Sequence, residues 1–280
     1  DAMSASTGDY DNDGDLDIYV SNTSIAPCVL LQNNGDGTFD DVAAQSSLEL
    51  NVLAWGGIWF DPDLDGDVDL YVCEHNYNYN QLPNPYMRNN GFGGFNNVAS
   101  SSFPFDYSNS YSGASCDWNL DGSPDLAVSN ISPQNASLWI NSGSDNQFFG
   151  CTLKGVISNS QGVGAIIHSW VNELVQTNMI HCGENYLGQN SNRILIGLGQ
   201  NQQIDSLNVL WPSGVTDTFF GLPAGFYGEI EEGSSYAVHL TPNGAHIICP
   251  GDSIALNAGL HLEYLWNTQN TIGSIFVSTP

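Results

Sequence analysis

Basic residues are the scarcest class in this 280-residue chain. Three Lys and Arg stand against 30 Asp and Glu, for a formal net charge of −27. Such a chain lacks the basic footprint that phosphate backbones require, which excludes nucleic acids as partners, and it disfavours docking on anionic membranes. Long apolar runs are also missing, so no membrane-spanning helix is expected. No leader precedes Asp1, so we expect either that one has been removed or that this is a piece of a longer chain.

Cysteine pairs of the CxxC type are absent among the six cysteines, so a thiolate zinc site is not expected. An even count in a chain so poor in Lys favours an oxidising, extracellular setting. Disulfide candidates are Cys151 with Cys182, across neighbouring strands, and Cys73 with Cys116, or with Cys28, between adjacent repeats. The connectivity stays open at this level.

Although nearly all charged residues are acidic, the fraction of residues that can form a hydrophobic core is ordinary. Hydrophobic residues make up 41% of the chain and charged residues only 12%. We therefore expect a folded protein rather than a disordered one. A folded chain with this much unbalanced carboxylate predicts a counter-cation, and a divalent metal is the first candidate.

An internal repeat accounts for much of the acidity. Segments 9–17 and 61–69 both read DxDxDGDxD, and 117–125 is a relaxed third copy, at spacings of 52 and 56 residues. A β-type run follows each segment, and LLQNNGDGTFDDVA at 30–43 matches YMRNNGFGGFNNVA at 86–99 position for position. Several short strands per repeat, broken by Gly and Asn turns, predict propeller blades.

The spacing within each segment predicts a calcium loop. Side chains at positions 1, 3 and 5 converge in a tight loop, Gly at position 6 permits the turn, and positions 7 and 9 complete six or seven oxygen ligands. An EF-hand would need Glu at position 12, where this chain has Val. Mg²⁺ fits less well because it prefers to keep several waters. Up to three Ca²⁺ are predicted, held by Asp9, Asp11, Asp13, Asp15, Asp17, Asp61, Asp63, Asp65, Asp67, Asp69, Asp117, Asn119, Asp121, Ser123 and Asp125.

These loops and the segments after them resemble FG-GAP/VCBS repeats, the calcium-loop blades of integrin-α-like propellers. Their specific form, with WGG before the loop and NNGxGxF after it, is similar to cartilage acidic protein and its bacterial relatives. The resemblance covers 1–149 and implies all-β blades with Ca²⁺ in the loop of each blade. Three blades do not close a ring. We expect either that blades preceding Asp1 are missing or that the open edges pair with another copy.

Residues 150–236 change character and predict an antiparallel, sandwich-like β-domain. The expected strands are 151–156, 164–171, 174–181, 193–197, 206–210 and 216–220. The segments NSQGVGA (159–165), GENY (183–186), ILIGLG (194–199) and the WPSG at 211–214 resemble the ASPIC/UnbV domain. That resemblance implies an extracellular β-domain without established catalysis.

Residues 237–280 predict the start of an immunoglobulin-like sandwich. Cys249-Pro-Gly-Asp-Ser and Tyr264-Leu-Trp266 resemble Ig/PKD modules of bacterial surface proteins. About 44 residues are too few for such a domain, which needs roughly 90–100. We expect either an incomplete chain or strands supplied by another molecule.

Together these features predict a secreted, calcium-binding structural or adhesion protein of the bacterial cell surface that is not an enzyme. The alternatives are a filament subunit assembled head to tail through incomplete β-domains, and a calcium-dependent carbohydrate-binding module using Trp55, Trp59, Tyr77 and Tyr79. Protein partners, other copies of the chain or glycans are the expected partners. Asn22, Asn130 and Asn135 lie in N-x-S/T motifs and are glycosylation candidates.

Overall fold

The computed structural model describes residues 1–23, 25–75 and 82–235, together with three strands near the C-terminus. It divides into two compact units, Asp1–Glu232 and Gly233–Pro280. The second unit contains one antiparallel sheet of β19 (Thr241–Asn243), β20 (Ser253–Asn257) and β21 (Ser274–Ser278). Cys249 and the predicted strand at 264–267 lie outside the described residues, and the predicted Ig/PKD module is not shown.

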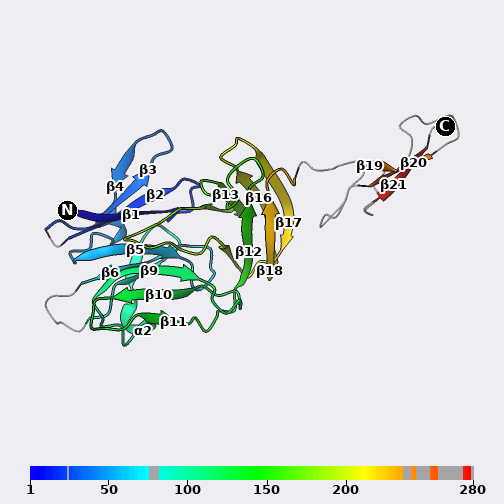
Figure 1. The fold of residues 1–280 in the computed structure, drawn as a ribbon. Helices are drawn as coiled ribbons and strands as arrows, with labels where there is room; N and C mark the ends of the chain where they lie inside the picture. The colour runs from blue at the N-terminus through cyan, green and yellow to red at the C-terminus, as the bar shows by residue number, and fades with distance from the viewer. Residues whose placement is uncertain (24, 76–81, 236–240, 244–252, 258–273, 279–280) are drawn as a thin grey trace. The chain divides into compact units, whose positions relative to one another are not determined.

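Three small antiparallel sheets form the N-terminal blades, as the repeat predicts (Figure 1). The first joins β1 (Ala2–Gly8), β2 (Asp17–Asn22), β3 (Val29–Asn33) and β4 (Phe39–Asp41) in order. The second joins β5 (Ala54–Phe60), β6 (Asp69–Glu74), β7 (Tyr86–Asn89) and β8 (Phe95–Asn97), and the third joins β9 (Ser110–Cys116), β10 (Asp125–Asn130) and β11 (Ser137–Trp139). The only described helices are the single turns α1 (Ala43–Ser46) and α2 (Ala99–Ser102). The predicted all-β, propeller-type fold class is confirmed.

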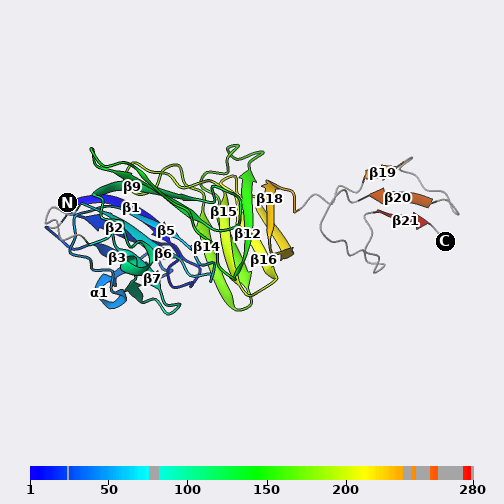
Figure 2. The ribbon, with the colours of Figure 1, turned by 90° about the horizontal axis from the view of Figure 1, so that it is seen from below.

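The blades pack side by side through their first strands, with β1 beside β5 and β5 beside β9 (Figure 1), and Figure 2 shows the same strands from below. Large aromatic side chains fill the spaces between the sheets. Trp59 of the second blade packs against Tyr19 of the first, with ring centroids 6.1 Å apart. Phe103 packs against Trp139 of the third blade at 5.2 Å. Burial of these rings drives the stacking, because each sheet alone is too small to bury a core.

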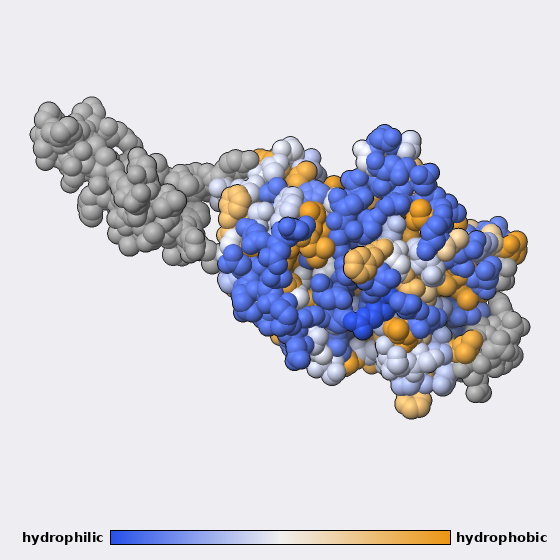
Figure 3. Space-filling model, turned by 180° about the vertical axis from the view of Figure 1, so that it is seen from behind, coloured by the Kyte–Doolittle hydropathy of each residue, from blue (hydrophilic) through white to orange (hydrophobic). Residues whose placement is uncertain are grey.

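One face of the first unit is mainly hydrophilic. Figure 3 shows one face on which hydrophilic side chains predominate, with small hydrophobic patches between them. In the part of the chain that the structure describes, no helix is long and apolar enough to cross a membrane.

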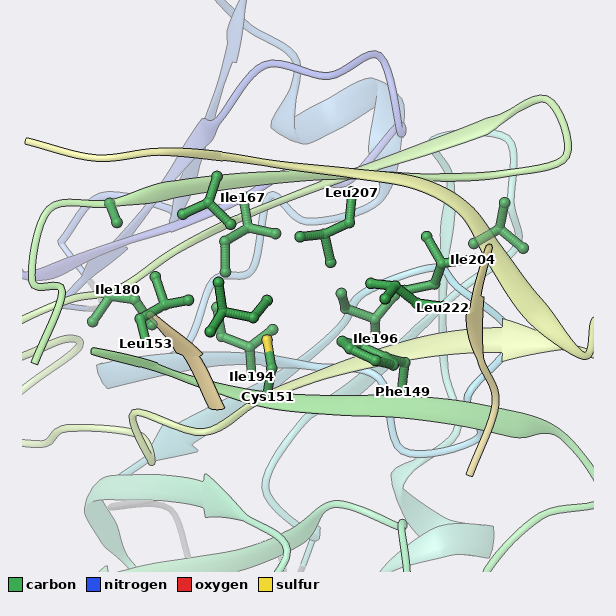
Figure 4. Close-up of a cluster of buried hydrophobic side chains, with 14 of the residues drawn as sticks. Phe149, Cys151, Leu153, Ile167, Ile180, Ile194, Ile196, Ile204, Leu207 and Leu222 are labelled. Carbon is green, nitrogen blue, oxygen red and sulfur yellow. The ribbon is translucent and has the colours of Figure 1, made fainter. Parts of the chain in front are cut away.

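Two further sheets follow the blades and share one core. One contains β12 (Gln147–Lys154), β15 (Ile194–Gly199) and β18 (Phe226–Glu231); the other contains β13 (Ile166–Val171), β14 (Leu174–Met179), β16 (Gln203–Leu210) and β17 (Thr216–Pro223). Side chains from both sheets, among them Phe149, Ile167, Ile196 and Leu207, interdigitate in the cluster of Figure 4. The predicted sandwich is therefore present, and five of its seven strands begin within three residues of the predicted starts.

Two features of the sandwich differ from the prediction. The prediction lacked β18, and β18 pairs with β12 in parallel, not antiparallel. Phe226–Glu231 alternates weakly and carries two acidic residues, which hid it as a strand. The position of β18 depends on the strands around it, because tertiary packing rather than a local turn determines which strand pairs with it in parallel.

The WPSG segment of the sandwich fixes the end of β18. The Trp211 indole donates to Asp217 at 2.7 Å. The Ser213 hydroxyl donates to Glu232, which also accepts three consecutive backbone N–H groups, those of residues 156, 157 and 158, each at 2.7 Å. Although desolvation acts to raise it, these hydrogen bonds lower the pKa of Glu232 to about 2. WPSG is thus a structural clasp.

A loop of the sandwich runs along the inner strand of the third blade. Asn190 Oδ1 accepts the Ser115 N–H at 2.8 Å, and Asn185 Nδ2 donates to the Gly113 carbonyl at 3.1 Å. These bonds satisfy backbone groups of β9 and join the sandwich to the blades within one compact unit.

The predicted disulfides do not form. All five described cysteines, residues 28, 73, 116, 151 and 182, are free. Cys151 points into the sandwich core (Figure 4), whereas Cys182 is exposed. Cys73 is fully buried between the second and third blades. None of the three candidate pairings is therefore present in this structure, and the sequence does not reveal the separate environments in which these cysteines lie.

Candidate metal centres in the blade loops

Each acidic segment is the hairpin loop between the first and second strands of its blade. All three loops share one backbone shape. Position 4 is left-handed in each, with φ of 55° at Asn12, 59° at Leu64 and 60° at Leu120. Position 6 has φ of 94–97°, which favours glycine there. The repeat therefore produces the predicted turn three times.

In the first loop, three carboxylates converge. Oxygens of Asp9, Asp11 and Asp17 lie within 4.8 Å of one another. Asp9 Oδ2 accepts the Thr177 N–H at 2.9 Å, and Asp11 Oδ2 accepts the Gln32 side-chain amide at 2.6 Å. The other oxygen, Oδ1, of both Asp9 and Asp11 is buried without a hydrogen-bond partner. Two buried acceptors are thus left facing no donor.

Three carboxylates also converge in the second loop, where an Arg takes the place of Gln32 as the donor to position 3. Oxygens of Asp61, Asp63 and Asp65 lie within 4.8 Å of one another. Asp61 Oδ2 accepts the Gly66 N–H at 3.0 Å, and Asp63 Oδ2 accepts from the Arg88 guanidinium. Here too, Oδ1 of Asp61 and of Asp63 is buried without a partner.

Burial makes these carboxylates difficult to ionise without a cation. Desolvation raises the pKa of Asp9, Asp17 and Asp69 to about 7, and that of Asp65 to about 6. It raises the pKa of Asp61 well above its usual range. A divalent cation among these oxygens would offset the desolvation and favour the charged forms. The donor set, all hard oxygens, fits Ca²⁺.

The carboxylate at position 9 of each loop makes a hydrogen bond at or just after the third strand that the spacing did not predict. Asp17, Asp69 and Asp125 are all buried. Each accepts the backbone N–H of an Asn at the third strand or just after it, namely Asn33, Asn89 and Asn141, at 2.8, 2.7 and 2.7 Å. These carboxylates tie the loop to the sheet, and only Asp17 also belongs to a converging acidic group among the described residues.

The third loop has the same backbone but different chemistry. Asp117 Oδ1 accepts the Asp121 N–H at 3.1 Å, while its Oδ2 accepts the Gly122 N–H at 2.8 Å and the Tyr227 hydroxyl. The Asn119 amide donates to Asp121 at 2.7 Å. Among the described residues, no group of three acidic side chains converges here. Hydrogen bonds thus engage the Asp117 and Asp121 carboxylates, and no oxygen of the third loop is among the described buried atoms without a partner, unlike in the first two loops.

The sandwich covers the loops. The Thr177 hydroxyl on β14 donates to the Gly14 carbonyl at 2.9 Å in the first loop. The backbone N–H of Gly199 donates to the Leu64 carbonyl at 2.8 Å in the second. Tyr227 of β18 reaches Asp117 in the third. Each loop thus lies where a blade meets the sandwich.

Sequence reasoning missed the residues that orient the carboxylates. Gln32 and Arg88 hold the carboxylates at position 3, and Thr177 holds Asp9. Gln32 and Arg88 occupy the same place in the two aligned repeats, directly before Asn-Asn, and that correspondence is the signal that could have found them. Thr177 lies 168 residues from Asp9 and has no such signal.

The three glycosylation candidates differ in accessibility. Asn22 is buried and its amide donates to the Pro27 carbonyl at 2.8 Å. The Asn130 amide donates to the Asn135 carbonyl at 2.7 Å, and Asn135 itself is exposed. Of the three, Asn135 has the side chain most available for modification, because the other two amides are engaged in hydrogen bonds.

Two family models match the chain. Residues 9–72 match the FG-GAP-like repeat, and 155–237 match ASPIC and UnbV. The two matched segments lie in the blades and in the sandwich, in the order that the sequence predicts. The relation to cartilage acidic protein is not shown. No curated protein sequence matches the chain.

Among solved structures, the crystal structure of the V. cholerae biofilm matrix protein Bap1 is similar over 90% of this chain, with 13% sequence identity and a TM-score of 0.27. The chain spans 43% of that protein chain. So distant a likeness carries no argument about function.

Proposed function

We propose that loops 9–17 and 61–69 bind calcium, and that calcium fastens the blades to the sandwich in a non-catalytic, extracellular structural or adhesion protein. One observation carries the proposal. The Oδ1 atoms of Asp9, Asp11, Asp61 and Asp63 are buried and lack any donor. Unpartnered buried carboxylate oxygens are costly, and a cation is the partner that their convergence favours.

The residues that would hold the ions are the converging carboxylates of each loop. In the first loop these are Asp9, Asp11 and Asp17, and in the second Asp61, Asp63 and Asp65. Backbone carbonyls and water would complete the six to eight oxygens that Ca²⁺ takes. The ion supplies charge compensation, and the chain's own hydrogen bonds orient the ligands.

The extracellular setting is supported by the repeat and domain matches and by the acidic composition. Extracellular modules bind calcium with Kd of about 10⁻⁴–10⁻³ M, so partly exposed loops such as these suffice outside cells. Protein partners or other copies of the chain are proposed as what the surface contacts.

Thermal unfolding with and without a chelator tests the calcium proposal. A hundredfold excess of calcium over Kd stabilises the folded state by about 2.7 kcal/mol per site. Two sites should therefore raise the Tm by about 10 °C or more. The double variant Asp9→Asn/Asp61→Asn should lose this calcium-dependent rise. Asp36→Asn, at an exposed acid outside the loops, is the control and should keep it. A Tm that is the same in excess chelator and in calcium would refute the proposal.

A second candidate is head-to-tail assembly of copies through the blades. Asn89 of the second blade donates to the Tyr10 carbonyl of the first at 2.7 Å, and Asn141 of the third donates to the Pro62 carbonyl of the second at 2.6 Å. The equivalent Asn33 bonds only within its own blade, among the contacts described for it. Electron microscopy in calcium tests assembly: ordered polymers support it, and discrete particles at every calcium concentration contradict it.

The carbohydrate-binding alternative gains no support from Trp55 and Trp59, the two described residues that it names. Trp59 packs between Tyr19 and Phe95, and Trp55 packs edge-on against Tyr186 with ring centroids 4.9 Å apart. Both indoles are therefore engaged in packing. Tyr77 and Tyr79 lie outside the described residues.

A further inference from the structure

The two candidate calcium loops differ at the residue that holds the carboxylate at position 3. Gln32 Nε2 donates to Asp11 Oδ2 at 2.6 Å in the first blade, and the Arg88 guanidinium donates to Asp63 Oδ2 in the second. Both donors leave the Oδ1 atom of their Asp buried and without a partner. The two side chains therefore orient their carboxylates in the same way.

The third blade shows what this donor is for. Its equivalent residue is Ile140, which precedes Asn141 as Gln32 precedes Asn33. The side chain of Ile140 cannot donate a hydrogen bond, and the loop of this blade has Asn119 in place of an Asp at position 3. The side-chain donor and the Asp at position 3 of the loop are thus both present in the first two blades, and both are missing in the third.

The donors differ in charge. Gln32 is neutral, whereas Arg88 is one of only three fixed cations in the sequence. Its guanidinium is half exposed and pairs directly with Asp63, a residue proposed to bind the metal. A divalent ion in the second loop therefore meets a positive charge that an ion in the first loop does not meet.

We propose that Arg88 makes the second loop the weaker of the two calcium sites, so that the loops fill in sequence as calcium rises. This rests on the proposed function. Repulsion between the guanidinium and a divalent ion, screened by water at a half-exposed position, lowers the affinity by roughly tenfold. The first loop then stays loaded at low calcium, and the second responds to higher concentrations.

Titration calorimetry of single-site variants tests the proposal. Asp63→Asn leaves the first loop as the intact site, and Asp11→Asn leaves the second; each change copies the Asn that the third loop already carries. The first loop should bind calcium about tenfold more tightly than the second. Adding Arg88→Gln to Asp11→Asn should raise the affinity of the second loop to that of the first. Adding Gln32→Arg to Asp63→Asn should lower the calcium affinity of the first loop to that of the second.

Lys154→Gln is the matched control. It removes one positive charge from a residue paired with Glu231 in the sandwich, outside the loops, and should leave both affinities unchanged. The affinity gap should also shrink in about 1 M KCl, where the Debye length falls to about 3 Å. A gap that persists at that ionic strength would mean that geometry, not charge, separates the sites, and would overturn the proposal.

Equal affinities in the two single-site variants, or no gain from Arg88→Gln, would also overturn it, while the proposed calcium function would stand. If neither loop binds calcium, the proposed function falls as well. Should the Asp→Asn variants fail to fold, the full chain carrying Arg88→Gln alone retains every carboxylate and is titrated instead. Its two affinities should then merge into one, and two unchanged affinities would contradict the proposal.

Discussion

At the scale of single residues, an asparagine on the third strand of a blade decides how neighbouring blades join. The Asn89 amide donates both to the Val68 carbonyl of its own blade, at 3.2 Å, and to the Tyr10 carbonyl of the preceding blade, at 2.7 Å. Asn89 is buried, so its loss would remove this donor from the Tyr10 carbonyl at a buried position between the blades. In the first blade, the side-chain amide of the counterpart Asn33 donates, among its described hydrogen bonds, only to the Leu16 carbonyl of its own blade, at 3.4 Å.

This difference predicts unequal costs for the same substitution. Asn89→Ala should lower the free energy of unfolding by about 2 kcal/mol, because a buried acceptor loses its partner. Asn33→Ala is the matched control and should cost about 1 kcal/mol or less. Urea denaturation of both variants in calcium measures the difference. Equal losses would show that the bond between blades contributes nothing beyond the bond within one blade.

At the scale of elements, the parallel pair of β12 and β18 depends on a buried carboxylate at its end. Glu232 directly follows β18, and the three backbone N–H groups that it binds directly follow β12 and Gly155. Three amides converging on one carboxylate form an anion-binding nest, filled here from within the chain. This clasp, formed by Glu232, the three amides and Ser213 of WPSG, joins the ends of β12 and β18, which no local turn connects.

The clasp predicts a specific dependence of stability on pH. The pKa of Glu232 lies at about 2 in the folded state, below its ordinary value of 4.5. The stability that Glu232 contributes is therefore fully present above pH 4.5 and is lost as the pH falls toward 2. Glu232→Gln should be less stable than the unmodified chain at neutral pH, and this deficit should narrow as the pH falls through that range.

Urea denaturation of both proteins across that range measures the deficit, and taking their difference removes the titration of the other carboxylates. Glu231→Gln, at the exposed neighbour paired with Lys154, is the control and should show little deficit at any pH. A deficit for Glu232→Gln that stays constant from neutral pH to pH 2 would contradict the assigned role.

At the scale of the whole first unit, the sandwich covers the ends of the blades at which the acidic loops lie. Thr177 contacts Asp9 and Gly14 of the first loop, and Gln176 beside it donates to the Gly197 carbonyl at 2.8 Å, next to the second loop. Strands β14 and β15 are thus bonded to segments more than a hundred residues away. Metal bound in the loops would act on the joint between two parts of the fold.

This arrangement predicts that calcium protects the sandwich as well as the loops. Hydrogen exchange should slow in calcium not only in 9–17 and 61–69 but also in β14 and β15, because their backbone groups bond to the loops. Strand β17 is the internal control, since it lies at the opposite edge of its sheet from β14, and its exchange should change least. Mass spectrometry of peptides with and without chelator measures this. Slowing confined to the two loops would disprove the coupling.

The repeat allowed much of the blade structure to be predicted from sequence. The Gly at position 6 of each loop makes the turn that the spacing predicts, and carboxylates at positions 1 and 3 converge in the first two loops. Position 9 was predicted to bind the metal, and the structure shows Asp69 and Asp125 accepting the backbone N–H groups of Asn89 and Asn141. The spacing within a loop predicts where each carboxylate lies, but it does not predict which hydrogen bonds that carboxylate accepts.

Composition and local spacing by themselves determined that this chain is an all-β protein of short sheets with acidic hairpin loops, because turn geometry and strand alternation act over a few residues. Only the tertiary structure decided which loops keep unpartnered oxygens. Tyr227 lies 110 residues from Asp117 and satisfies it, while Asp9 and Asp61 each retain a buried oxygen without a donor. The physical reason is that hydrogen-bond satisfaction in a buried site depends on what packs against it from distant parts of the chain, and no repeat records that.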